Sequence, residues 1–271
     1  MLPFWALALL AGSAIVAIVA MLAVRRFSPE SLFRDPVPAA AVFGVLGVAF
    51  AVILAFVMFL AFESYGKATD GASREAVAVT QLARVGRLFP DPQGDELRDG
   101  LACYARAVVF DEWPRMREAE ESAVVRDWIA RIEATISEIE VDDTVSQIAL
   151  GHLLDEMAVR REGRRARLAE APPTIPQPVW LMLTLGAVLT IAYVAVFADR
   201  RERWWTQAVM IGSITALIVS GMLVISFLDR PYEQDGAYVA PTEMAASARM
   251  IAEEVAAAAG RLPCDAEGRP N

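Results

Sequence analysis

The stretch FGVLGVAFAVILAFVMFLAF runs from Phe43 to Phe62 without a charged residue. An α-helix needs ~20 apolar residues to cross the ~30 Å of hydrocarbon in a bilayer, so this stretch predicts a membrane-spanning helix. The uncharged segment around it begins at Pro38, and three other segments share its apolar character: Pro3–Val24, Val179–Ala198 and Trp204–Leu228. We predict an all-α integral membrane protein with four transmembrane helices, rather than a soluble protein with four buried core helices.

The first apolar segment is expected to remain as a membrane anchor. A cleaved signal peptide has a basic region before its apolar run. Here the chain begins MLPFW, and the basic residues Arg25 and Arg26 follow the run instead.

The spans divide the chain into four predicted parts. Residues 1–62 hold the first transmembrane pair, 63–178 an extramembrane helical bundle, 179–228 the second pair, and 229–271 an acidic tail with a short helix. The net charge is −9 at pH 7. Nucleic acid binding needs concentrated lysine and arginine, so we expect the lipid bilayer as a partner and no nucleic acid.

Loop charges predict the orientation in the membrane. Four crossings place the bundle and both termini on one side and the two short loops on the other. The short loops are basic, with Arg25, Arg26 and Arg34 in one and Arg200, Arg201 and Arg203 in the other. Short basic loops favour the cytoplasm, which puts the bundle outside. The segment RREGRRARL, residues 160–168, is a counter-signal, and we interpret it as a solvated helix end or a contact with lipid phosphates.

Apolar residues at helical spacing predict four helices in the bundle. The first lies over Ser73–Phe89, and the Asp91-Pro92 pair ends it and starts the second. The four predicted buried stripes are Ala78, Leu82, Val85 and Phe89; Leu97, Leu101, Tyr104 and Val108; Val125, Ile129, Ile132, Ile136 and Ile139; and Val145, Ile148, Leu153 and Met157.

The sequence Glu112-Trp113-Pro114 predicts a structural corner. Proline disfavours helical backbone in the residue before it, so the second helix should end near Glu112–Trp113, with Pro114 starting a short new helix. Trp113 would anchor this corner. Neighbouring residues point about 100° apart on a helix, so Asp111 and Glu112 are poorly placed as a catalytic acid and base.

Catalytic and metal-binding patterns are sparse. The chain has one histidine and two cysteines, and we expect no metal site, no cofactor and no enzymatic activity. His152 is expected in the core. Cys103 and Cys264 must lie on the same side of the membrane, and a buried thiol is favoured for Cys103, with a disulfide as the alternative on an oxidising side.

Two patterns in the spans indicate helix packing or a pore. Small residues repeat every four positions and let helices approach closely, within a subunit or between subunits. They are Gly47, Ala51 and Ala55 in the second span and Gly212, Ala216 and Ser220 in the fourth. One step around the second span lie Val48, Val52, Phe56 and Phe59, which either face lipid or form a hydrophobic constriction that gates ions by dewetting.

The order of four motifs resembles the bestrophin-like family of bacterial membrane proteins. The motifs are FGVLGVAFAVILAFVMFLAFESY, EAVAVTQLARVGRLFPDP, YARAVVFDEWPRM and LDRPY, and the resemblance covers roughly Val42–Tyr232. It implies a multi-pass protein of the bacterial cytoplasmic membrane. A more distant similarity to true bestrophins, which are pentameric anion channels with a cytosolic large domain, implies a homo-oligomer, inorganic anions as permeant species, and Val48, Val52 and Phe56 facing the pore. The chain lacks their acidic calcium-binding run and has fewer aromatics in this stretch.

Two functional hypotheses follow. The first is a homo-oligomeric ion channel, conducting anions, with the second helix lining a hydrophobic pore. The second is a membrane-anchored sensing or interaction protein whose acidic helical domain binds a partner.

Overall fold

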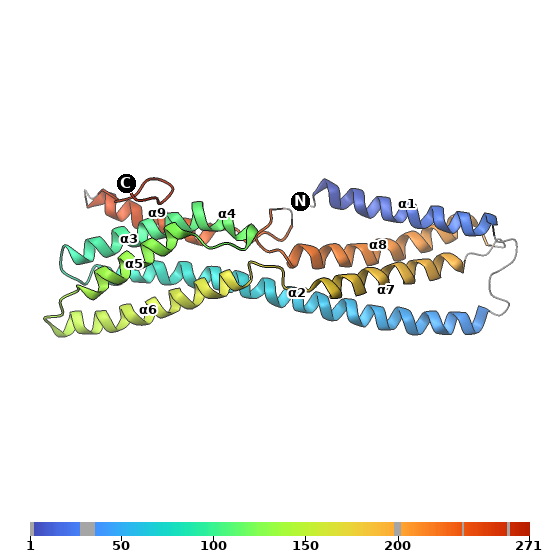
Figure 1. The fold of residues 1–271 in the computed structure, drawn as a ribbon, viewed down its shortest axis with the longest axis horizontal. Helices are drawn as coiled ribbons and strands as arrows, with labels where there is room; N and C mark the ends of the chain where they lie inside the picture. The colour runs from blue at the N-terminus through green and yellow to red at the C-terminus, as the bar shows by residue number, and fades with distance from the viewer. Residues whose placement is uncertain (1–2, 28–35, 198–201, 235, 259–260) are drawn as a thin grey trace. The chain divides into compact units, whose positions relative to one another are not determined.

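The computed structural model describes residues 3–27, 36–197, 202–234, 236–258 and 261–271, and these form helices without strands. Figure 1 shows the arrangement. The elements are α1 (Phe4–Phe27), α2 (Pro36–Gly86), α3 (Gln93–Ala107), η1 (Val108–Glu112), α4 (Trp113–Arg115), η2 (Met116–Glu118), α5 (Ala123–Ser137), α6 (Thr144–Ala169), α7 (Gln177–Val196), α8 (Trp204–Leu228) and α9 (Thr242–Ala257).

Four of these helices, α1, α2, α7 and α8, are long and apolar enough to cross a membrane. This confirms the prediction of an all-α chain with four candidate spans. The basic residues Arg34, Arg200 and Arg201 of the predicted short loops lie outside the described residues.

The chain divides into two compact units. The membrane unit comprises Met1–Ser64, Pro173–Asp229 and Asp235–Ala237, and the bundle unit comprises Tyr65–Pro172, Arg230–Gln234 and Tyr238–Asn271. The bundle unit thus includes most of the C-terminal tail, because α9 packs on α3.

In the membrane unit, α1 packs on α7 and α8, and α7 packs on α8 (Figure 1). The first part of α2 contributes Phe50, Val57 and Ala61 to a buried cluster with residues of α7 and α8. Gly186 of α7 lies under the Phe50 ring, where an added Cβ would collide with it. A small residue in α7 therefore lets α2 approach closely.

The turn into α7 is fixed by Asp229, at the end of α8. Its buried carboxylate accepts hydrogen bonds from the backbone N–H groups of Thr174 and Ile175, both at 2.8 Å. These N–H groups precede α7 and need an acceptor away from water. The aspartate of the Asp-Arg-Pro motif is therefore a structural ligand for the α7 entry.

Helix α2 is longer than the sequence predicts. The prediction of a span ending near Phe62 and a separate helix over Ser73–Phe89 is wrong, because α2 continues from Pro36 to Gly86. The connecting residues contain no proline, and their two glycines, Gly66 and Gly71, each cost only about 1 kcal/mol in a helix. Helical propensity therefore persists where hydrophobicity falls.

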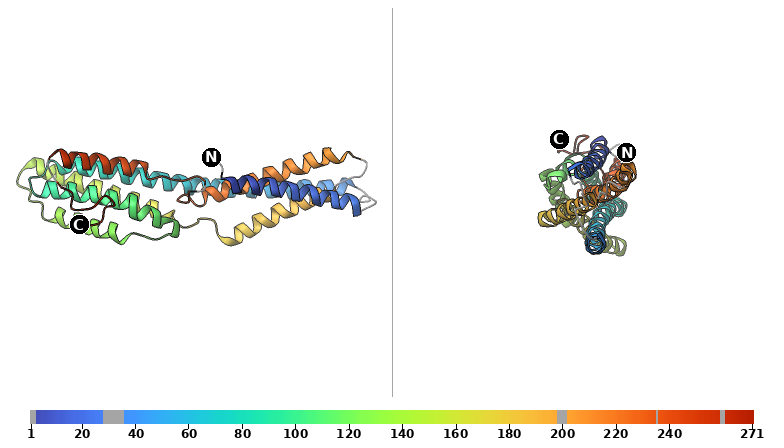
Figure 2. Two further views of the ribbon diagram at one scale, coloured as in Figure 1. Left: turned by 90° about the horizontal axis from the view of Figure 1, so that it is seen from above. Right: turned by 90° about the vertical axis from the view of Figure 1, so that its right-hand side faces the viewer.

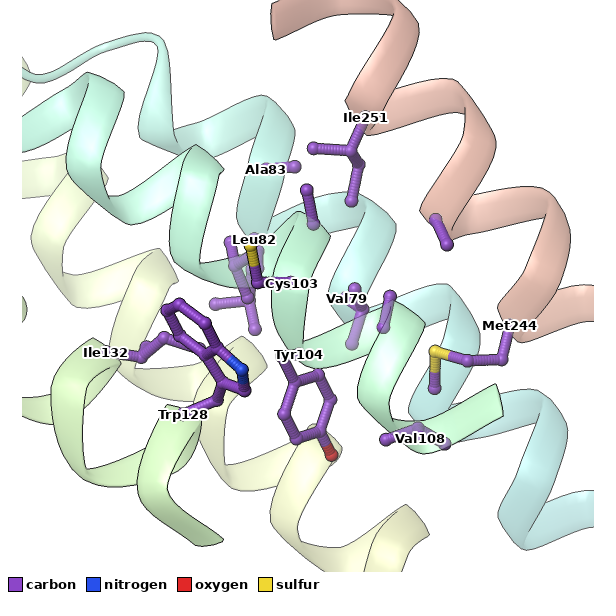
Figure 3. Packing of buried hydrophobic residues seen from close by; sticks show 14 of the residues in the cluster. Val79, Leu82, Ala83, Cys103, Tyr104, Val108, Trp128, Ile132, Met244 and Ile251 are labelled. Carbon is purple, nitrogen blue, oxygen red and sulfur yellow. The ribbon is translucent and has the colours of Figure 1, made fainter. Parts of the chain in front are cut away.

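The core of the bundle unit lies between α2, α3, α5 and α9. Figure 3 shows side chains from these four helices converging, among them Leu82, Tyr104, Trp128 and Ile251. Figure 2 shows α9 running beside the last part of α2, where the Ser247 hydroxyl donates to the Ala76 carbonyl at 3.1 Å. The predicted stripes from Ala78 to Phe89 and from Leu97 to Val108 are confirmed as buried, and that from Val125 to Ile139 as buried or half-buried.

The predicted stripe on α6 is partly wrong. Val145 and Ile148 are 62% and 70% exposed, whereas Leu153 and Met157 are buried as expected. The buried face continues from Met157 to Arg160 and Arg167. Apolar residues alone therefore did not identify the buried face of α6, because that face includes arginines.

Helices α2 and α6 cross at two glycines. A Cβ added to Gly163 would lie 2.6 Å from the backbone nitrogen of Glu75, and one added to Gly71 would lie 2.7 Å from the backbone nitrogen of Arg167. These are backbone atoms, which cannot move aside as a flexible side chain can. The crossing thus requires glycine on both helices.

Replacing Gly163 with alanine should destabilise the bundle unit. Overpacking a close contact costs about 1–3 kcal/mol, which outweighs the gain in helix propensity. We expect a lower melting temperature for Gly163→Ala in detergent solution. Gly151→Ala is the matched control on α6, since nothing lies within 4 Å of its added Cβ, and it should melt at or above the wild-type temperature. Equal melting temperatures for the two variants would contradict the close crossing.

Candidate functional site

The predicted pore residues form one uncovered face of α2. Val48, Val52, Phe56 and Phe59 are 66%, 63%, 62% and 62% exposed in the chain. At 100° per residue they fall within a sector of about 80° on the helix. The structure brings the four residues together on one apolar surface.

The opposite face of α2 packs within the chain. Phe50 and Val57 point away from the Val52 face and are buried against α7 and α8. Helix α2 therefore has one side fixed by its own chain and one side available to lipid, water or another subunit.

The small residues of α2 lie at the edge of the uncovered face. Ala51 and Ala55 are exposed and Gly47 is half-buried, with nothing within 4 Å of a Cβ added there. The α8 repeat differs, because a Cβ added to Gly212 would lie 3.6 Å from the Ile18 side chain of α1. Its other members, Ala216 and Ser220, are half-buried. The α8 glycine thus serves a contact inside the chain.

The predicted corner residue Trp113 is buried in the bundle unit, at 3% exposure. Its indole Nε1 donates to the Val239 carbonyl at 2.9 Å, and its ring meets Tyr232 edge-on at 5.8 Å between centroids. The Arg167 guanidinium lies over its face at 4.8 Å. Trp113 therefore joins α4 to the chain that follows α8.

The predicted corner at Glu112–Trp113 is confirmed in part, because the π-type turn ends at Glu112 and the short helix α4 begins at Trp113 with Pro114 in its first turn, but the backbone does not break there. Helical backbone continues through Trp113, whose N–H bonds to the Val108 carbonyl five residues earlier. Pro114 has no N–H and its ring would crowd the carbonyl four residues before it. A wider π-type turn over Val108–Glu112 accommodates it, and the chain leaves the helix only at Ala119, with φ at +56°.

Glu112 is fully buried in an ionic network with Glu75 and two arginines of α6. Arg167 bridges the two carboxylates, at 2.6 Å from each. Arg164 makes a second pair with Glu112 at 2.5 Å, and the Tyr104 hydroxyl donates to Glu75 at 2.5 Å. The network thereby links α2, α3, η1 and α6.

Burial and ion pairing shift the pKa values of Glu112 and Arg167 in opposite directions. Burial raises the pKa of Glu112, but Arg167 and Arg164 outweigh it and hold that pKa below its usual value. Burial lowers the pKa of Arg167, yet the two carboxylates raise it overall. Burial and the nearby Glu75 charge raise the pKa of Tyr104, so its hydroxyl stays protonated and can donate. The ionised pairs are therefore the stable form at neutral pH.

The interpretation of the RREGRRARL segment as a solvated helix end is wrong for Arg160 and Arg167, which are buried. A sequence signal for this existed. Leu153, Met157, Arg160, Arg164 and Arg167 recur at alternating spacings of four and three, so the arginines continue the apolar stripe. The buried guanidinium of Arg167 requires carboxylate partners, which Glu75 and Glu112 supply.

The two cysteines are joined. Cys103 of α3 and Cys264 form a disulfide with 5.8 Å between their α-carbons, so the expectation of a free buried thiol is wrong. The expectation of a core histidine also fails, because His152 is exposed on α6. Within the described residues, no group of histidine, cysteine and acidic side chains could hold a metal ion.

The fold and apolar helices define the chain as a multi-pass, all-helical membrane protein. A family model of the bestrophin-like domain matches residues 6–241, so the chain belongs to the bestrophin-like family. No curated protein matches it.

Solved structures show the same fold at low sequence identity. A bacterial bestrophin homologue from Klebsiella pneumoniae is 16% identical with a TM-score of 0.68, covering 91% of this chain and 97% of its own. A substituted form of that homologue is 15% identical with a TM-score of 0.67, covering 94% and 99%. A crystal structure described as a membrane protein gives 13% identity and a TM-score of 0.71, covering 94% and 100%.

Acid should weaken the network through Glu112. The pKa of Glu112 is lower in the folded chain than its reference value of 4.5. The ionised side chain therefore contributes its full stabilisation of the fold when the pH is above the unfolded-state pKa. This contribution is lost as the pH falls through the folded-state pKa. We expect the melting temperature of the wild type to decrease when the pH is lowered below about 4.5. Glu112→Gln should melt lower than wild type at pH 7 and show a shallower decline in acid. Parallel pH profiles would contradict a paired, ionised Glu112.

Proposed function

We propose that this protein is a homo-oligomeric ion channel whose pore is lined by the uncovered face of α2. The observation that carries the proposal is the sector of Val48, Val52, Phe56 and Phe59, exposed in the chain and free of charge. In an oligomer such a face encloses an apolar constriction, which controls ions by dewetting. Membership of the bestrophin-like family supports the same conclusion.

Subunit contacts would form beside the pore face. Ala51 and Ala55 are exposed on α2, and small residues let neighbouring helices pack closely in lipid. By analogy with true bestrophins we propose a pentamer that conducts inorganic anions. Reversal potentials under a chloride gradient would test the anion preference.

The bundle unit is proposed to face the outside of the bacterial cytoplasmic membrane. The disulfide between Cys103 and Cys264 supports this, because disulfides persist in oxidising compartments. Arg25 and Arg26 at the end of α1 support it as well, since basic residues beside short loops favour the cytoplasm. The orientation is opposite to that of true bestrophins.

Truncating Phe56 should change ion conduction. Phe56→Ala removes a ring from the narrow apolar face and should raise single-channel conductance or the open probability in planar-bilayer recordings. Leu9→Ala is the control, because Leu9 is 52% exposed on α1 and outside the proposed pore. Identical current–voltage curves for wild type and Phe56→Ala would remove this face from the pore.

Cysteine labelling should place the bundle unit outside. Ser137 is exposed at the end of α5, and the two native cysteines are paired and buried, so they should not react. We expect a membrane-impermeant maleimide to label Ser137→Cys in intact spheroplasts and to leave wild type unlabelled. Labelling only after lysis would place the bundle unit in the cytoplasm.

The second candidate function is partner binding by the bundle unit. A groove of about 680 Å³ between α3, η1 and α9 supports it, with Phe110 at its edge 57% exposed. An interaction protein without a pore would give no conductance in the same bilayers, which separates the two functions.

A further inference from the structure

A second groove in the bundle unit gathers four arginines. It has a volume of about 470 Å³ and is lined by Arg160, Arg161, Arg164 and Arg165 of α6, together with Glu121 and Glu133. The arginines occupy positions i, i+1, i+4 and i+5, which form two adjacent rows on one side of a helix. The groove therefore carries more positive than negative charge.

Arg160 is a buried cation without a counter-ion. Its side chain is 2% exposed, and no carboxylate of the described residues lies within ion-pair distance of it. Its Nη1 reaches the Tyr104 hydroxyl at 3.4 Å, and its Nε has no hydrogen-bond partner within the described chain. A buried polar group of this kind is expected to have a partner.

The surrounding network does not neutralise Arg160. Glu75 and Glu112 provide two negative charges, which Arg167 and Arg164 already pair. Tyr104 is held in its neutral form, because burial and Glu75 raise its pKa. One positive charge is thus left over beneath the groove.

The groove rim also has unused positive charge. Arg165 is exposed, and within the described residues it makes no ion pair. Arg161 approaches Glu133 only at 3.7 Å, with both side chains about half or more exposed. Such exposed pairs contribute little and can exchange for a better ligand.

We propose that this groove is a binding site for a phosphate-bearing anion. Planar guanidinium groups match the several oxygens of a phosphate, and arginines in adjacent rows can approach it from two sides. The anion would supply the missing counter-charge to Arg160 and bind Arg161 and Arg165 at the rim. The proposal does not depend on ion conduction.

Inorganic phosphate titrated into the full-length protein in detergent tests the site. At constant ionic strength maintained with chloride, phosphate should raise the wild-type melting temperature saturably. Arg165→Gln should weaken the apparent phosphate affinity about tenfold, because it removes a charged hydrogen-bonding group. Since Arg165 makes no ion pair with the described residues, this variant should keep the wild-type melting temperature without phosphate.

Arg126→Gln is the matched control, with the same charge change at an exposed position of α5 outside the groove. It should bind phosphate as wild type does. Equal weakening of phosphate binding in both variants would overturn the site.

A parallel titration identifies the source of the phosphate. Dihexanoyl phosphatidylglycerol, used below its micelle-forming concentration, presents a lipid headgroup. Stabilisation by this lipid that Arg165→Gln weakens would support the site with a lipid headgroup as ligand. Stabilisation by inorganic phosphate alone would support it with a free anion. No Arg165-dependent response to either probe would overturn it.

Discussion

The buried guanidinium of Arg167 is the interaction on which the bundle unit depends. It holds Glu75 of α2 and Glu112 of η1 at 2.6 Å each and stacks on Trp113. Removing one member would leave an uncompensated charge in the interior, which typically costs about 3–5 kcal/mol. Because each pair also needs correct geometry, the network restricts how these helices can meet.

The glycine crossing makes that geometry possible. Gly71 and Gly163 bring the backbones of α2 and α6 into contact. Glu75 and Arg167 lie four residues beyond these glycines, one turn along each helix, so their side chains meet directly. The π-type turn then places Glu112 on the same guanidinium, because Pro114 forces the helix to widen at that point. Glycine, proline and buried charge are parts of one arrangement.

The sequence predicts features that one residue property governs. Long uncharged segments identify the spans, and apolar periodicity identifies the stripes on α2, α3 and α5. Apolar periodicity fails as a predictor where the buried groups are polar. In α6, for example, Arg160 and Arg167 are buried at positions that were assigned to the surface. The carboxylate partners of Arg167 lie 92 and 55 residues away in the sequence, and nothing local reveals such pairs. The uncovered α2 face could be identified from spacing, but whether another subunit covers it depends on contacts outside a single chain.

Helix packing and orientation in the membrane depend on different residues, so proteins that share this fold can differ in orientation. Structures only 13–16% identical share this helical arrangement, so packing tolerates nearly complete replacement of the sequence. Orientation depends instead on a few charges beside the membrane ends, which contribute little to packing. Arg25 and Arg26 are such charges. The disulfide is an independent indicator, since Cys103 and Cys264 lie in the bundle unit and do not affect insertion. The basic residues at the end of α1 and the disulfide have different physical origins, and both support the proposal that the bundle unit faces outside. A shared fold alone is not evidence against that orientation.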